Sequence, residues 1–82
     1  MGHNLWSLKA GDKACISGYD EALAKSYRVR LMELGFHPGE VVSCLQAPRF
    51  GAPKVYRVAN TIFSIDDEVG IHINIIPVPG HG

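Results

Sequence analysis

Apolar and polar residues alternate along most of the chain with the two-residue period typical of β-strands that bury one face. This pattern predicts five short strands, at residues 13–17, 41–46, 54–58, 61–65 and 70–75. The last segment alternates most regularly, with Ile71, Ile73 and Ile75 expected on one face and His72 and Asn74 on the other. Each predicted strand therefore has an inner face that contributes to a shared core.

One segment near the front has the period of an amphipathic helix instead. Its apolar residues recur at i, i+4, i+8 and i+11: Leu23, Tyr27, Leu31 and Leu34. We expect this face, including the ring of Tyr27, to pack in the core. Asp20 and Ser26 are both suitable N-caps, so the start of the helix has two alternatives. Gly35 follows the last apolar position and predicts a left-handed stop.

Turn residues separate the remaining segments. Pro38 and Gly39 predict a type II turn at residues 37–40, and the two prolines of residues 47–53 predict a long loop. Five short strands with one helix between the first and second predict a mainly β fold, a small and strongly bent antiparallel barrel. We expect one domain over residues 1–76 and a flexible tail over 77–82, which is rich in proline and glycine.

Charge balance restricts the kind of partner. The 82 residues contain eight Lys and Arg and eight Asp and Glu, which gives a formal net charge of zero. Nucleic acids and anionic membranes attract proteins through clustered basic residues, and the chain has no surplus of them. We therefore expect no nucleic-acid partner and no direct insertion into a membrane. We also expect a cytoplasmic protein, because Cys15 and Cys44 form no disulfide framework and the first residues do not resemble a signal peptide.

Four blocks of residues resemble the FeoA family. Residues 8–14 are similar to its opening L-x-x-G-x-x-A, and residues 30–39 (RLMELGFHPG) to its R-L-x-x-L-G-hydrophobic-x-P-G signature. Residues 47–53 resemble its A-P-x-G-x-P loop, and residues 64–73 its closing strand, turn and strand. The signature around Gly35 is the most specific of the four, and the similarity extends from about Leu5 to Ile75.

This resemblance implies a five-stranded barrel of the SH3-like type and a role beside FeoB, the permease of bacterial ferrous iron uptake. The implied protein is a small cytosolic accessory that binds FeoB and supports or regulates it, which would place it at the inner face of the membrane. Two features depart from the family pattern. The proline loop is one residue longer at Arg49 and Phe50, and Asp66 stands where many relatives have a basic residue.

The chain contains no catalytic motif, so we predict no enzymatic activity. Binding to a partner protein is the remaining kind of function, and exposed charged and aromatic positions are its candidates. The candidate partner-binding residues are Arg28, Arg49, Phe50, Asp66 and Asp67. The tip of the 47–53 loop supplies two of them, although Phe50 folded back over the barrel is an equal alternative. Weak self-association is left open.

We predict no resident cofactor and no dedicated metal site, because the histidines and cysteines lack clustered ligand spacing. The acidic residues 66–68 together with His72 form the only local cluster with ligands suited to iron. Weak binding of a divalent ion, Fe or Zn, is therefore left open. The alternative function is a metal-responsive regulatory SH3-like module, similar to the C-terminal domains of iron-dependent repressors.

Overall fold

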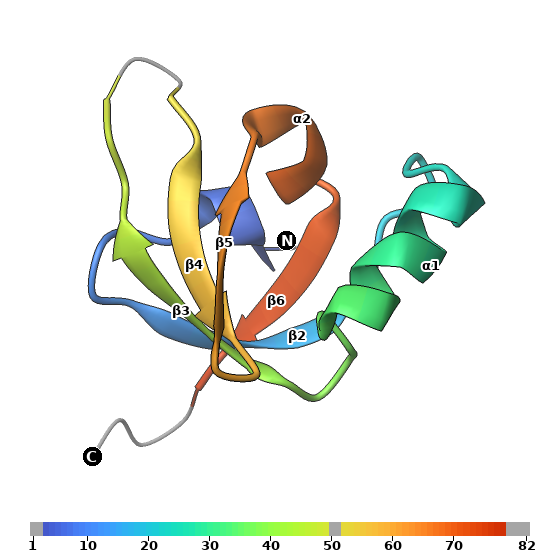
Figure 1. The fold of residues 1–82 in the computed structure, drawn as a ribbon, viewed down its shortest axis with the longest axis horizontal. Helices are drawn as coiled ribbons and strands as arrows, with labels where there is room; N and C mark the ends of the chain where they lie inside the picture. Colours follow the sequence, from blue (N-terminus) through green and yellow to red (C-terminus); the bar gives the residue numbers. More distant parts are fainter. Residues whose placement is uncertain (1–2, 50–51, 79–82) are drawn as a thin grey trace.

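A computed structural model describes residues 3–49 and 52–78, which form a mainly β fold (Figure 1). Six antiparallel strands make one sheet in the order β1-β6-β2-β3-β4-β5. The strands are β1 (His3–Asn4), β2 (Lys13–Tyr19), β3 (Val41–Gln46), β4 (Lys54–Val58), β5 (Thr61–Ile65) and β6 (Ile73–Pro77). The helical elements are the 3-10 turn η1 (Leu5–Ser7), α1 (Lys25–Leu34) and the single turn α2 (Asp67–Gly70).

Over these residues the sheet has six strands rather than the predicted five. The additional strand, β1, has only two residues, His3 and Asn4, which pair with Ile75 and Asn74 of β6. A two-residue strand has no alternation, so hydrophobic pattern alone does not reveal it. The pairing becomes visible only when the two ends of the chain are placed side by side.

The last strand begins at Ile73 rather than at residue 70, because Asp67–Gly70 form α2. Ile71 is therefore in a turn and is exposed, while Ile73 and Ile75 are buried as predicted. β6 extends to Pro77, whose Cα is opposite that of Ala14. The strand thus includes the first residue of the predicted tail, and residues 79–82 lie outside the described part of the chain.

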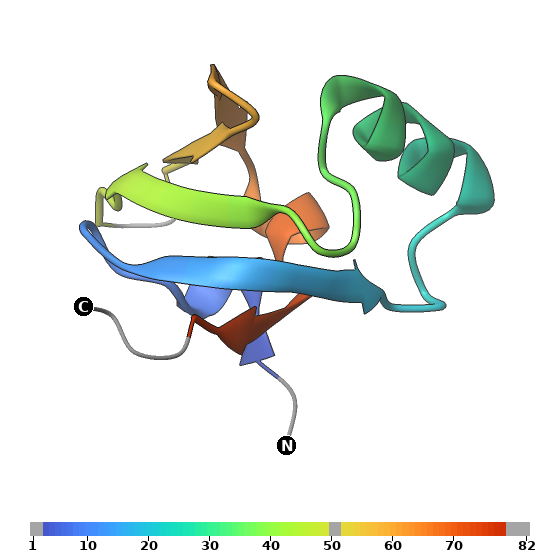
Figure 2. The same cartoon turned by 90° about the horizontal axis from the view of Figure 1, so that it is seen from below.

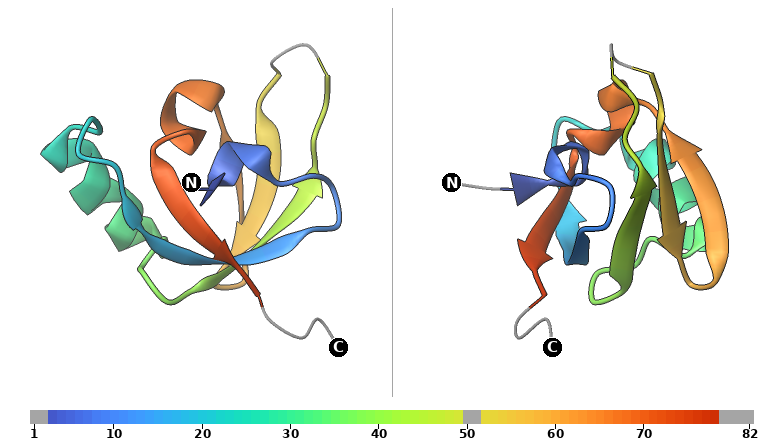
Figure 3. Two further views of the ribbon diagram at one scale, coloured as in Figure 1. Left: turned by 180° about the vertical axis from the view of Figure 1, so that it is seen from behind. Right: turned by 90° about the vertical axis from the view of Figure 1, so that its left-hand side faces the viewer.

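The strands form two packed layers with the core between them. One view shows β3, β4 and β5 together, with β1 and β6 on the opposite side (Figure 3). The described residues of β5 pair with β4 alone, and β1 and β5 are the two ends of the strand order. Closure of the sheet into the predicted barrel is therefore not shown.

A single apolar cluster fills the space between the layers. Its largest fully buried side chains are Tyr56, Phe36, Leu5, Ile16 and Ile73. The hydroxyl of Tyr56 donates a hydrogen bond to the carbonyl oxygen of Leu5 at 3.0 Å, which satisfies the one polar atom of this ring inside the core. Trp6 covers the edge of the cluster, where Lys54 Nζ lies 4.6 Å from its ring centroid.

The predicted turns are confirmed, whereas neither predicted N-cap is. Gly35 ends α1 with φ of 114°, and its N–H donates to the carbonyls of Leu31 and Met32. Gly39 has φ of 97° in the turn in which the Glu40 N–H donates to the His37 carbonyl at 3.0 Å. The N-cap of α1 is Ala24, and no side chain caps this end of the helix.

Candidate functional site

Helix α1 lies beside the sheet (Figure 2), and residues before and after it attach it to the strands and to His72 through hydrogen bonds. Before the start of the helix, the Asp20 N–H donates a hydrogen bond to the His72 carbonyl oxygen at 2.8 Å. The side chains repeat this link, since Nδ1 of His72 lies 3.1 Å from Oδ2 of Asp20. Hydrogen bonds from His72 and from the Ala22 N–H favour the carboxylate, and they hold the pKa of Asp20 below its ordinary value.

The other end of α1 is attached through the residues that follow it. Phe36 is fully buried, and its carbonyl oxygen accepts a hydrogen bond from the hydroxyl of Tyr19 at the end of β2. Gly35 lies so close to the β4–β5 turn that an added Cβ would be 3.3 Å from Cβ of Ala59. The first contact ties this end of α1 to β2, and the second places its last turn against the β4–β5 hairpin.

Within α1 itself, the core receives one side chain. Leu31 is buried, whereas Tyr27 is 47% exposed and Leu34 is 46% exposed. The prediction that Tyr27 packs in the core is therefore wrong. Leu31 packs on the core, whereas Tyr27 in the first turn of the helix and Leu34 at its last residue lie on the wall of a groove.

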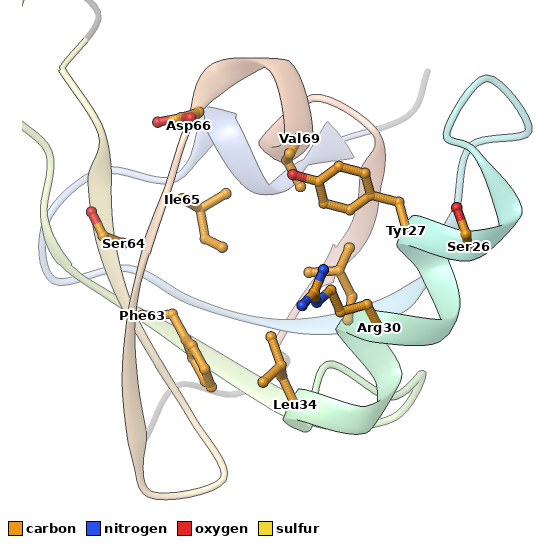
Figure 4. A pocket seen from close by; sticks show the side chains of 10 residues that line it. Ser26, Tyr27, Arg30, Leu34, Phe63, Ser64, Ile65, Asp66 and Val69 are labelled. Carbon is orange, nitrogen blue, oxygen red and sulfur yellow. The ribbon is translucent and has the colours of Figure 1, made fainter.

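This groove, of about 480 Å³, separates α1 from β5 and α2 (Figure 4). We call it the α1–β5 groove, and it is lined by Ser26, Tyr27, Arg30, Leu31, Leu34, Phe63, Ser64, Ile65, Asp66 and Val69. Tyr27 extends from the helix toward Val69 of α2, and Leu34 lies opposite Phe63 of β5. Phe63 is itself held in place by Phe36, with the ring centroids 5.0 Å apart. The β5 wall of the groove is thus supported from behind by the core.

Charged groups stand at two places along this apolar surface. Arg30 projects into the groove from α1, and Asp66 lies at the end of β5 beside α2 (Figure 4). Within the described ranges, no Lys or Arg lies within ion-pair distance of an Asp or Glu, and the one contact of a carboxylate with a basic side chain is that of Asp20 with His72. Arg30 and Asp66 therefore do not neutralise each other in this structure, and each has its charge available to a bound molecule.

The structure brings one of the five predicted partner-binding residues to this groove, Asp66. Arg28 is half-buried on α1 outside the groove, and its Nε atom has no hydrogen-bond partner among the described residues. Arg49 is exposed in the β3–β4 loop, Asp67 is exposed at the start of α2, and Phe50 lies outside the described residues. Their roles in binding stay predictions.

Most of the groove could not be predicted from the sequence, since Tyr27, Leu34, Phe63 and Val69 all have the pattern of core residues. One signal was present. Arg30 lies three residues after Tyr27 and four before Leu34, which places a charge inside the apolar stripe of the helix. A helix face that docks fully on a core does not usually contain such a residue.

Over residues 3–49 and 52–78, no three His, Cys, Asp or Glu side chains gather in a way that could hold a metal ion. His72 is turned toward Asp20 rather than toward the acidic residues of α2. Cys44 is buried, and burial raises the pKa of its thiol, which disfavours the thiolate that metals bind. None of the helices in these ranges has the length and apolar character needed to cross a membrane.

Comparison with known proteins identifies the family. A family model described as the FeoA domain matches residues 3–77. The FeoA protein of Chlorobium tepidum superposes with a TM-score of 0.84 at 25% identity, over 98% of this chain and 74% of that one. FeoA of Stenotrophomonas maltophilia, described as an SH3 domain protein and solved with zinc, has a TM-score of 0.78 at 25% identity, over 89% and 88% of the two chains.

A third structural match concerns the fold alone. A manganese-dependent transcriptional repressor superposes with a TM-score of 0.80 at 13% identity, and the match covers 94% of this chain and 42% of the repressor. No curated protein sequence matches the chain.

The six-stranded antiparallel sheet with its flanking helix is thus a small domain of the SH3-like class. The chain belongs to the FeoA family, whose members are non-enzymatic accessory proteins associated with ferrous iron transport.

Proposed function

We propose that this protein binds the FeoB ferrous iron permease in the cytoplasm, at the inner face of the membrane, and supports its transport activity through protein contact. The observation that supports this most directly is the α1–β5 groove, where two large side chains of α1, Tyr27 and Leu34, are about half exposed beside Phe63 and Val69. An apolar concavity bordered by charges is typical of surfaces that receive an anchor residue of a partner.

The neutral net charge is consistent with this proposal. Long-range attraction to polyanions needs an excess of basic residues, whereas a protein partner can be recognised by a local apolar contact with a few charges around it. Asp66 belongs to this proposed surface because it lines the groove. Arg28, Arg49, Phe50 and Asp67 are proposed as peripheral contacts, which the same experiment examines one residue at a time.

The test measures binding of the purified chain to full-length FeoB from the same organism, held in lipid nanodiscs. Leu34→Ser removes an apolar contact of the groove, and we expect Kd to rise about ten-fold or more. Ile76→Ser is the matched control, since Ile76 is 53% exposed on β6 and does not line the groove. Ferrous iron uptake in a deletion strain that carries each variant should follow the same order.

Two results would contradict the proposal. One is that the unchanged chain shows no binding to FeoB. The other is an equal loss of binding for Leu34→Ser and Ile76→Ser, which would place the contact outside the groove.

A further inference from the structure

Strand β5 forms one wall of the α1–β5 groove and is also the open edge of the sheet. Its neighbour on one side is β4, and Figure 1 shows α1 beyond its other side. In the described part of the chain no strand pairs with that second side. An open edge carries backbone N–H and C=O groups that another chain can use.

The β4–β5 turn determines which residues of β5 direct their backbone N–H and C=O groups toward the open edge. Ala59 and Asn60 both have positive φ, as a two-residue hairpin turn requires, and Val58 is opposite Thr61. In such a hairpin the residues next to the turn form a hydrogen-bonded pair, and hydrogen-bonded and non-hydrogen-bonded pairs then alternate. Phe63 and Ile65 therefore bond to β4, whereas Ile62 and Ser64 direct their backbone groups toward the open edge.

Nothing in the sequence of β5 protects this edge. Natural edge strands commonly contain Lys, Pro or a bulge that discourages pairing. β5 has none of these, since its five residues are Thr, Ile, Phe, Ser and Ile and its register with β4 is continuous. The neighbouring α1 does not cover it either, because the groove separates the two elements.

We infer that the partner binds as an extended segment that pairs with β5 as an added strand, inside the α1–β5 groove. This inference rests on the proposed function and specifies how the same site recognises its partner. Ile62 and Ser64 would supply the backbone hydrogen bonds, at the usual spacing of about 4.8 Å between strands. Every second side chain of the segment would face Tyr27, Leu34 and Phe63, so these positions should be large and apolar.

Charge specifies one further feature of the segment. Arg30 projects into the groove and has no ion pair with any described residue. An acidic side chain of the segment that faces the groove would pair with it. Asp66, at the end of β5, would repel an acidic side chain of the segment at that end of the groove. The expected segment is therefore extended, alternately apolar, and acidic at one groove-facing position.

The test again uses full-length FeoB in nanodiscs and changes the backbone of β5. Ser64→Pro removes an outward N–H and places the proline ring on the open edge, without loss of a bond to β4. We expect its Kd for FeoB to rise about ten-fold or more, whereas Ser64→Ala, which keeps the N–H, should stay within about two-fold. Arg30→Glu should weaken binding and Lys25→Glu, on the same helix outside the groove, should not.

A second measurement does not depend on how Ser64→Pro folds. Amide hydrogen exchange of the unchanged chain should show slow exchange at Phe63 and Ile65 and fast exchange at Ile62 and Ser64. Addition of FeoB should slow exchange at Ile62 and Ser64. Exchange at these two amides that is unaffected by bound FeoB would overturn the inference.

The remaining outcomes separate this inference from the proposed function. If Leu34→Ser loses binding while Ser64→Pro and Ser64→Ala bind equally well, the groove is the docking site but strand addition is wrong. If the unchanged chain is a dimer that Ser64→Pro dissociates, a second copy occupies the edge and the inference is overturned. Failure of the unchanged chain to bind FeoB overturns both.

Discussion

Tyr56 shows how a single buried residue joins elements that are far apart in the sequence. Its ring is fully buried, and its hydroxyl reaches the carbonyl oxygen of Leu5 in η1. Burial, together with the nearby Cys44, raises the pKa of the Tyr56 hydroxyl far above its usual range, so the group stays a hydrogen-bond donor. β4 and the first turn of the chain are thereby held at a fixed separation.

Tyr56→Phe should therefore lower the free energy of unfolding by about 1 kcal/mol, because the buried carbonyl of Leu5 loses a donor while the ring volume is retained. Urea unfolding followed by the fluorescence of Trp6, the only tryptophan, measures this loss. Tyr27→Phe is the matched control, since Tyr27 is about half exposed and its hydroxyl can bond to water. Equal stability of the two variants would show that the Tyr56 hydrogen bond contributes nothing.

At the scale of elements, the position of α1 determines whether the groove exists. Gly35 ends the helix with a positive φ and also allows it to approach Ala59 of the β4–β5 turn. Asp20 and His72 hold the opposite end. Between these two attachments Leu23 and Leu31 are buried, and Leu31 is the one buried residue of the helix itself, so small changes at either end should alter the width of the groove.

Gly35→Ala should destabilise the fold by about 1 to 2 kcal/mol through the left-handed backbone, and further through the contact with Ala59. Gly39→Ala isolates the backbone effect, since Gly39 has φ of 97° but open space around its Cα. We expect Gly35→Ala to be the more destabilising of the two in urea unfolding, and to weaken FeoB binding as well. If the two variants are equally stable, the approach to Ala59 is not a tight contact.

The link between Asp20 and His72 predicts a dependence of stability on pH. The pKa of Asp20 is lowered in the folded state, so the ionised carboxylate stabilises the fold above the ordinary pKa of 3.8, and this contribution disappears as pH falls through the folded value. Asp20→Asn should lower Tm slightly at neutral pH and have little effect at about pH 2. Glu21→Gln, an exposed change in the same loop, should have little effect at either pH. A Tm difference for Asp20→Asn that persists undiminished in acid would contradict this interpretation.

At the scale of the whole molecule, the possible metal ligands are dispersed. His72 contacts Asp20, Cys44 is buried in the core, and the acidic residues of α2 belong to no group of three possible ligands within the described residues. The docking protein and the alternative, a metal-responsive module, differ in whether a metal ion binds stoichiometrically. The relative from Stenotrophomonas maltophilia was nevertheless solved with zinc, so the point requires measurement.

Anaerobic calorimetry with Fe(II) and with Zn(II) should therefore show no saturable binding at a one-to-one ratio. Variants of the groove, such as Leu34→Ser, should leave this result unchanged, because the proposed contact with FeoB involves no metal. Stoichiometric binding of either ion, with a change in affinity for FeoB, would favour the regulatory module instead.

Local patterns in the sequence determined most of the strands of this protein and the end of its helix. Strands β3, β4 and β5, and most of β2, followed from the two-residue period, and the stop at Gly35 from the residue that best tolerates positive φ. These features depend on neighbours in the sequence. The FeoA-like signature around Gly35 likewise indicated the family, because its residues are contiguous in the chain.

Tertiary structure alone decided which side chains of α1 are buried. Tyr27 and Leu34 have the spacing of core residues, yet they line a groove because the helix is held at Asp20 and Phe36 by contacts with His72 and Tyr19. The open edge of β5 is equally invisible in the sequence, since strand order depends on pairings between distant segments. Residues far apart along the chain set the distance between helix and sheet, and that distance creates the proposed site.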